Sequence, residues 1–326
     1  MTEVLIALVK SAVIVFALLT GFAYATLLER RLVGRLQVRI GPNRTGPLGL
    51  LQPLADGIKL AFKEDVAPRG ADRLMFAAAP LISTTAALIA FAVIPIGPDV
   101  NLFGLPVSLV LADVNVGILY FLAVSSMGVY GIVLAGWASN SKYSLLGGVR
   151  ASAQMISYEL ALGLSLIGVV MIAGSLKLTD IVEYQQFTPM VVLQPLGFII
   201  FTIAAYAETN RAPFDMAEAE QELTAGYHTE YSGMKFAMFF LAEYISMITI
   251  SSIATTMFLG GYHGPVAPGP WWFVLKVFIL MCGYIWTRAT LPRLRYDRLM
   301  KFGWQILLPL ALLNVGLTAI AIVILG

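Results

Sequence analysis

Eight apolar runs of membrane-spanning length constrain this chain more than any other feature. A helix of about 20 apolar residues crosses a bilayer, and hydrophobic residues make up 59% of the 326 residues. Charged residues make up only 12%, roughly half of their share in a water-soluble domain. A soluble domain is therefore excluded, and the sequence predicts an all-α integral membrane protein with one polytopic domain over residues 1–326. The predicted spans are Val4–Leu28, Leu74–Ile96, Val114–Trp137, Gly147–Gly174, Met190–Ala207, Lys235–Leu259, Trp271–Ala289 and Gly303–Leu325.

Lysine and arginine are concentrated on one predicted side of the membrane. Of the 21 such residues, 18 lie in or beside the connections after the first, third, fifth and seventh runs, and the others are Lys10, Lys177 and Lys276. Cytoplasmic loops carry an excess of positive charge, so these connections, at about 29–73, 138–146, 208–234 and 290–302, are predicted to be cytoplasmic, with both termini outside. The arginines after the first run also indicate an uncleaved helix, although Ala23-Tyr24-Ala25 resembles a signal-peptidase site.

A short amphipathic helix is predicted inside the first cytoplasmic connection. Pro53 suits the first position of a helix, and about eleven residues are too few to cross a bilayer. The helix is therefore expected to lie in the membrane interface; the alternative is a small capping helix without lipid contact. Its apolar face would hold Leu54, Ala55, Ile58, Ala61 and Phe62, and its polar face Gln52, Asp56, Lys59 and Lys63.

Six of the 19 acidic residues crowd into residues 208–230, between two apolar runs. Carboxylates gathered at the mouth of a bilayer usually mark an ion or proton path. A solvated connecting loop is the alternative interpretation.

Local signals divide this acidic stretch. Ala212-Pro213 is expected to end the fifth span, because the residue before proline avoids the helical region. Asp215 and Glu218 form a capping-box pattern that predicts a short cytoplasmic helix. Capping leaves the carboxylates of Glu220, Glu222 and Glu230 unexplained. The cations Arg288, Arg293 and Arg295 are predicted on the same side, where they pair with this stretch or with a docked protein, or act only as topological anchors.

Among the ionisable residues within predicted spans are Glu159, Glu243 and Lys276. A charge in a bilayer is costly, so each is expected to have a partner or to face water. Glu159 and Glu243 lie in the cytoplasmic part of their spans, and with Glu208 they are expected to converge at one depth. A buried carboxyl group without a nearby cation has a raised pKa, which suits proton transfer near neutral pH. Structural interhelical hydrogen bonds are the alternative.

The inventory of residues that bind metals or cofactors is small. Cys282 is the only cysteine, and His228 and His263 are the only histidines, so no Cys/His metal site or iron–sulfur cluster can be assembled. The chain has neither a Walker loop nor a dinucleotide-binding Gly-x-Gly-x-x-Gly fingerprint. Nucleic acid is not expected as a partner, because acids interrupt a basic surface that lies against a membrane.

Several motifs in order resemble one family, the quinone-chamber membrane subunit of respiratory complex I, the proton-pumping NADH:quinone oxidoreductase of bacteria and mitochondria. The stretch Glu208–Leu223 resembles its signature. The other matching blocks are Glu29–Arg31 with Arg39–Arg44, Leu51–Lys59, Gly136–Gly147, Ser157–Glu159 and Arg288–Asp297. The outer loops and the last span match only in being short or apolar.

The resemblance implies a fold, a function and roles for individual residues. It implies a bundle of about eight transmembrane helices plus the interfacial helix, in the bacterial inner membrane. The bundle would close a quinone cavity completed by soluble subunits, and would couple quinone reduction to proton translocation. Quinone would be the substrate; flavin and iron–sulfur clusters would lie in partner subunits. Small membrane subunits and antiporter-like subunits would be neighbours.

The implied roles fall into three groups. A proton path would use Glu159, Glu208, Glu243 and Glu218. Charges of the quinone chamber or subunit interface would be Glu29, Arg30, Arg39, Arg211, Asp215, Glu220, Glu222, Arg288 and Arg293. The interfacial helix, with Asp56 and Lys59, would border the opening through which quinone arrives.

Three other functions compete with this interpretation. The same scaffold could serve a related membrane-bound hydrogenase or a quinone reductase with another electron donor. A stand-alone cation or proton transporter would use the same buried acids and would work as a purified single chain. A passive anchor for peripheral subunits would tolerate neutralisation of Glu159 or Glu208.

Overall fold

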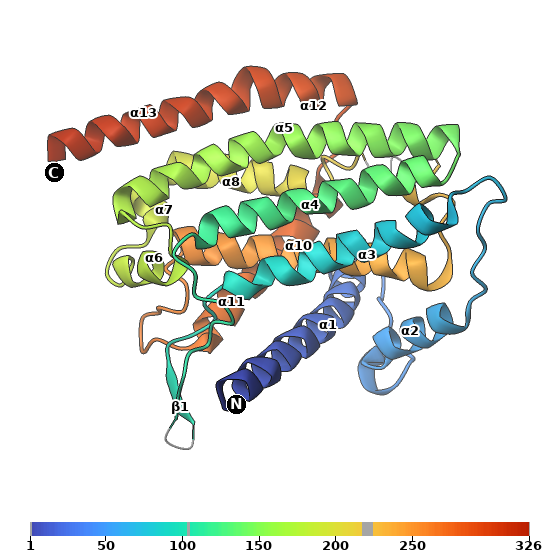
Figure 1. The fold of residues 1–326 in the computed structure, drawn as a ribbon, viewed down its shortest axis with the longest axis horizontal. Helices are drawn as coiled ribbons and strands as arrows, with labels where there is room; N and C mark the ends of the chain where they lie inside the picture. Colours follow the sequence, from blue (N-terminus) through green and yellow to red (C-terminus); the bar gives the residue numbers. More distant parts are fainter. Residues whose placement is uncertain (1, 103–104, 217–223, 326) are drawn as a thin grey trace.

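The fold is a helical bundle, seen here in a computed structural model that describes residues 2–102, 105–216 and 224–325 (Figure 1). Within these residues, seven helices are long and apolar enough to cross a membrane. They are α1 (Thr2–Leu36), α3 (Arg73–Ala90), α4 (Gly117–Ala138), α5 (Lys142–Ala173), α10 (Gly233–Phe258), α11 (Pro270–Thr290) and the continuous segment of α12 (Tyr296–Phe302), a π-helical turn (Gly303–Leu307) and α13 (Leu308–Leu325). The predicted all-α membrane fold is confirmed.

The fifth predicted span, Met190–Ala207, is interrupted. Its residues form α7 (Met190–Leu193) and α8 (Pro195–Glu208), which has 14 residues. Gln194 between them has φ −129° and ψ 55°, outside the helical region, because the ring of Pro195 disfavours a helical conformation at the residue before it. α8 is therefore an apolar helix of roughly 21 Å, shorter than the hydrocarbon core.

Helix ends follow local sequence signals. Asp72 caps α3, because its Oδ1 accepts hydrogen bonds from the backbone N–H groups of Leu74 and Met75. Gly174 ends α5 in the left-handed conformation, with φ 69°, that glycine adopts without strain. The π-helical turn precedes Pro309. Proline has no backbone N–H to donate to the carbonyl group four residues earlier, so the hydrogen-bond pattern before it can change from α-helical to π-helical.

Small residues let the central helices pack closely. α3 packs on α4, α4 on α5, and α10 on α3, while α13 lies along α5 at the opposite edge of the bundle from α1 and α2 (Figure 1). A Cβ atom on Gly131 of α4 would lie 3.0 Å from the Ala79 carbonyl oxygen of α3. A Cβ atom on Gly136 would lie 2.6 Å from the Ser144 carbonyl oxygen of α5. Such contacts are typical of helix association in membranes.

The predicted amphipathic helix is present as α2 (Gln52–Phe62), 11 residues long. It packs against α1 and α10, and the Arg30 side chain of α1 pairs with Asp56 at 2.6 Å. Its apolar residues Leu54, Ile58 and Phe62 are exposed. An apolar face without protein cover is what a helix lying in the membrane interface requires.

The connections between the long helices contain structure that the sequence did not predict. Strands β1 (Val100–Leu102) and β2 (Leu105–Val107) form a small antiparallel hairpin. The helix α6 (Leu178–Tyr184) lies between α5 and α7. Short 3-10 turns cover Pro47–Gly49, Phe91–Val93 and Gly226–His228.

The intramembrane lysine has the partners that its burial demands. Lys276 of α11 donates hydrogen bonds from Nζ to the carbonyl oxygens of Leu259, Gly261 and His263 at 2.6, 2.9 and 2.7 Å. These carbonyl groups follow the C-terminal end of α10, which is a favourable place for a cation. The prediction that this charge is partnered is confirmed.

Candidate functional site

A cluster of charged side chains, buried at its centre, joins three long helices to one loop. Glu29 comes from α1, Glu243 from α10, Arg288 from α11, and Arg211 from the loop after α8. Glu29 and Arg211 are 7% and 5% exposed. Buried charges are stable only when they are paired and hydrogen-bonded, so the contacts within this cluster determine its structure.

Arg211 is the centre of the cluster. Its Nη1 lies 3.1 Å from both carboxylate oxygens of Glu29, and its Nε lies 2.5 Å from Oε1 of Glu243. The guanidinium group stacks over the Tyr244 ring at 4.4 Å from the centroid. Burial alone would lower the pKa of Arg211, but Glu243, Tyr244 and Glu29 together raise the pKa above its usual value. Arg211 is therefore a permanent positive charge that holds two carboxylates.

Glu29 receives hydrogen bonds from several directions. Besides Arg211, Arg288 forms an ion pair with its Oε1, and the Tyr244 hydroxyl donates to its Oε2 at 2.6 Å. The four charged side chains contribute two positive and two negative charges. A polar network whose members satisfy one another in this way rigidifies the structure around it.

The loop that carries Arg211 is fixed by α5. Gln154, fully buried on α5, donates from Nε2 to the carbonyl oxygens of Ala207 and Phe214 at 2.8 and 2.7 Å. Asn210 adopts a left-handed conformation with φ 51°, which asparagine tolerates better than most residues. α8 ends at Glu208, four residues before Ala212. The chain therefore turns earlier than Pro213 alone predicts.

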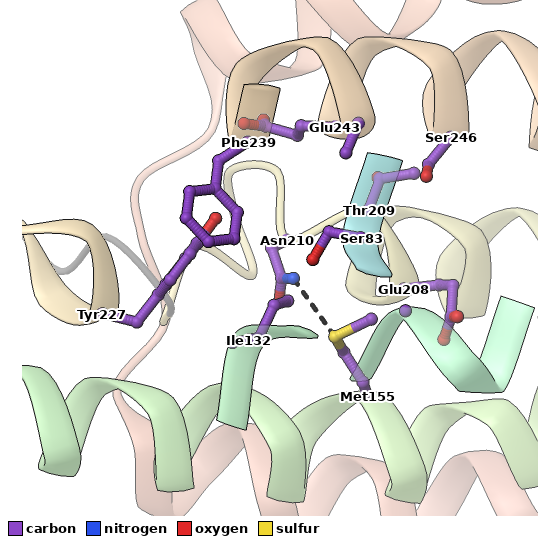
Figure 2. Close-up of a pocket in the computed structure, with 12 residues that line it drawn as sticks. Ser83, Ile132, Met155, Glu208, Thr209, Asn210, Tyr227, Phe239, Glu243 and Ser246 are labelled. Atoms are coloured by element: carbon purple, nitrogen blue, oxygen red, sulfur yellow. Dashed lines mark hydrogen bonds between the residues drawn. The ribbon is translucent and has the colours of Figure 1, made fainter. Parts of the chain in front are cut away.

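Glu208 and Glu243 line one small cavity of about 60 Å³ (Figure 2). Asn210, Met155 and Ser246 also line it. Glu243 thus belongs both to the cluster around Arg211 and to the cavity that contains Glu208. Glu208 is 8% exposed, and no described cation forms an ion pair with it.

The expected convergence of three intramembrane acids holds for two of them at this cavity. Glu159 is half-buried on α5 and is not among the residues that line the cavity. It interacts electrostatically with Glu208, so it lies nearby. A buried carboxylate without a cation beside it was expected, and among the described residues Glu208 is such a group. Glu243 is not, because Arg211 neutralises it.

A second, larger cavity of about 580 Å³ lies between α1, α10 and α11. Residues Val13 to Arg31 of α1 line it, a length of roughly 27 Å along the helix. The other described lining residues are almost entirely apolar: Leu50, Phe91, Ile96, Ile248, Ser252, Phe273, Val274, Val277, Phe278 and Met281. Glu29 follows the lining residue Leu28 on α1, although none of the four charged side chains of the cluster is itself among the described lining residues.

The remaining predicted site residues have varied surroundings. Arg30 and Asp56 pair at the exposed junction of α1 and α2. Lys59 is exposed on α2, and Arg39 is exposed in the loop after α1, where its Nε donates to Gln37. Arg293 donates from Nη2 to Sδ of Met216 at 3.3 Å, and Asp215 is half-buried. Glu218, Glu220 and Glu222, with the predicted helix that Asp215 would cap, lie outside the described residues.

Several neutral residues of the site were not identified from the sequence. Gln154 and Asn210 position the loop of Arg211, Tyr244 binds Glu29, and Met155 and Ser246 line the cavity at Glu208. Gln154 was detectable, because an amide side chain inside an apolar run needs a polar partner. Met155 carries no such signal, since methionine is a common core residue. Among the described residues, no group of His, Cys, Asp and Glu side chains could hold a metal ion.

Comparison with known proteins gives near full-length matches. A family model described as NADH dehydrogenase matches residues 9–319. Three relatives each bear the name of the same membrane subunit, designated H, of an NADH-quinone oxidoreductase. The protein of Thermomicrobium roseum is 56% identical over 318 residues, which cover 94% of this chain and 93% of that protein. The protein of Syntrophotalea carbinolica is 56% identical over 311 residues, covering 95% and 94%. The protein of Protochlamydia amoebophila is 56% identical over 300 residues, covering 92% of each chain.

Proposed function

The chain belongs to the NADH dehydrogenase family, and we propose that, as a membrane subunit of an NADH-quinone oxidoreductase, it forms part of the quinone chamber and couples quinone reduction to proton translocation. The observation that carries this proposal is the long apolar cavity beside α1, together with the cluster of paired charges around Glu29, which follows the lining residue Leu28. Neither feature alone would suffice, because an apolar cavity between membrane helices also accommodates lipid.

The cavity suits a ligand with a long apolar tail and a polar head. Its volume of about 580 Å³ lies within the usual range for ligand sites. A prenyl tail would lie along α1 between α10 and α11. The head group would then be directed toward the end where Glu29, Arg211 and Arg288 lie. There, fixed charges interact with the negative charge that develops on quinone oxygens during reduction.

The cluster also provides a route for coupling. Reduction of quinone to quinol takes up two electrons and two protons, and negative charge develops on the quinone head next to Glu29 until the protons arrive. Arg211 connects Glu29 to Glu243, and Glu243 lines the cavity that contains Glu208. A change at the quinone head is thereby transmitted to the acids Glu243, Glu208 and Glu159, which form the proton path with Glu218.

Electrons come from outside this chain. Flavin and iron–sulfur clusters belong to partner subunits, and the soluble subunits that complete the quinone site dock on the cytoplasmic face. Arg39, Arg293, Asp215, Glu220 and Glu222 contribute to that docking surface. Small membrane subunits and antiporter-like subunits lie beside the bundle in the inner membrane, and both termini lie outside the cytoplasm.

The quinone site is tested by filling the cavity. Val277→Trp places a large side chain among the lining residues of α11. The matched control is Ile279→Trp. Ile279 lies on the same helix, is 58% exposed and is not among those lining residues. In the assembled complex, Val277→Trp is expected to raise the KM for a long-tailed quinone much more than for a short-tailed one. Electron transfer to a soluble acceptor should stay unchanged in both variants. Equal KM values for long-tailed quinone in the two variants would show that the tail binds elsewhere.

A further inference from the structure

Two small cavities meet at Glu208. The first, of about 60 Å³, contains Glu243 and Asn210 and is shown in Figure 2. The second, of about 50 Å³, lies between α3, α4, α5 and α10 and is lined by Phe121, Ser125 and Thr249, among others. Three described residues line both cavities: Met155, Glu208 and Ser246. These three side chains therefore face both cavities and form part of the wall between them.

Both cavities have the size and polarity to hold water. A water molecule needs roughly 10–15 Å³ of such space and two or more polar partners, so each cavity has room for several. Ser83 Oγ and Glu208 Oε2 at the first cavity, and Thr249 Oγ1 at the second, are buried without a hydrogen-bond partner among the described residues. All three side chains are more than nine-tenths buried. Such atoms are normally satisfied by ordered water.

Met155 is held in place at the wall. Asn210 donates a hydrogen bond from Nδ2 to Sδ of Met155 at 3.3 Å (Figure 2). Gln154 donates to Oδ1 of Asn210 at 3.3 Å. The Met155 side chain is 6% exposed. A thioether is only a weak acceptor and donates no hydrogen bond, so it interrupts a chain of waters and cannot pass a proton on.

We propose that Met155 is a partition that separates the waters of the two cavities, so that a proton crosses from one to the other only through Glu208. This inference rests on the proposed proton path and adds a positioning residue to it. A hydronium ion in the first cavity gives its proton to the Glu208 carboxylate, forming one O–H bond. That bond breaks when a water of the second cavity takes the proton, and the carboxylate is regenerated with no electron transferred.

The functional test removes the carboxylate and the partition together. In the complete complex reconstituted in vesicles, Glu208→Gln is expected to abolish proton translocation. Met155→Ala in the same chain opens a water route past Gln at position 208 and should restore translocation severalfold over Glu208→Gln alone. Met155→Leu with Glu208→Gln, which keeps an apolar wall of similar volume, should stay as inactive as Glu208→Gln. Ile156→Ala with Glu208→Gln, changed at an exposed neighbour on α5, is the control and should also stay inactive.

The result for Glu208→Gln separates this inference from the proposed function. If translocation persists in Glu208→Gln and is lost when Ser246→Ala is added, the proton passes through the Ser246 hydroxyl, and the partition is overturned while the proton path stands. If translocation persists in both, this region carries no protons and both ideas are wrong. If Glu208→Gln is inactive and Met155→Ala restores nothing, Met155 is not the partition.

A second measurement does not depend on activity or on the stability of the Met155→Ala variant. Electron cryo-microscopy of the wild-type complex, at a resolution that shows ordered waters, is expected to show two groups of waters on either side of the Met155 side chain. An unbroken file of waters past Met155, or dry cavities, would contradict the partition directly.

Discussion

Replacing Arg211 with methionine is expected to destabilise this chain more than any other single loss of a cation in its described part. The change leaves the volume of the long side chain largely intact but removes a charge that is 5% exposed. Glu29 keeps Arg288 and Tyr244 as partners, whereas Glu243 loses its ion pair with Arg211. Removing one partner of a buried ion pair costs about 3–5 kcal/mol. Because Glu29 stays paired, we expect about 3 kcal/mol, roughly a hundredfold in an equilibrium constant.

Two further variants test the cause of this loss. Arg211→Lys keeps the charge but loses the planar fork and the stacking on Tyr244, and should cost about 2 kcal/mol, the value of a hydrogen bond to a charged group. Adding Glu243→Gln to Arg211→Met removes the carboxylate that lost its ion pair, and should recover most of the stability. Arg30→Met is the matched control, because its pair with Asp56 is half-exposed and is worth at most about 1 kcal/mol.

The assay is the thermal midpoint at which the chain dissociates from the purified complex, together with quinone reductase activity. The expected order of midpoints is wild type and Arg30→Met, then Arg211→Lys, then Arg211→Met, with Arg211→Met plus Glu243→Gln above Arg211→Met. The reasoning would be refuted if Arg211→Met matched Arg30→Met, or if Glu243→Gln lowered the midpoint of Arg211→Met further.

The other predictions concern coupling, topology and the loop. Glu159→Gln should assemble and pass electrons to a soluble acceptor while quinone reduction and proton translocation both fall; normal translocation would leave this residue a structural role. A cysteine replacing the exposed Val38 should be protected from an impermeant thiol reagent in intact cells, and one replacing the exposed Val266 should react; the opposite pattern would reverse the orientation. Gln154→Leu leaves two buried carbonyl groups without their donor and should destabilise the chain by about 2 kcal/mol in the same thermal assay.

The sequence by itself determined the membrane helices. Apolar run length and helix propensity are local properties, and in a bilayer every backbone group must be satisfied within its own helix. Seven long helices therefore lie close to their predicted positions, and α2 was found from Pro53 and its amphipathic pattern. The break at Gln194 was also present in the sequence, because the effect of Pro195 on the residue before it is local.

Only the tertiary structure decided which charges meet. Arg211 pairs with Glu29 across 182 residues, and Arg288 does so across 259, and no spacing rule reaches so far. Glu208 and Glu243 look alike in the sequence, yet Arg211 neutralises one and no described cation pairs with the other. Met155 acquires a role only because α5 places it beside both cavities. The physical reason is that charge pairing and cavity shape depend on the close approach of several helices, while the pattern of a single helix reports only which face is apolar.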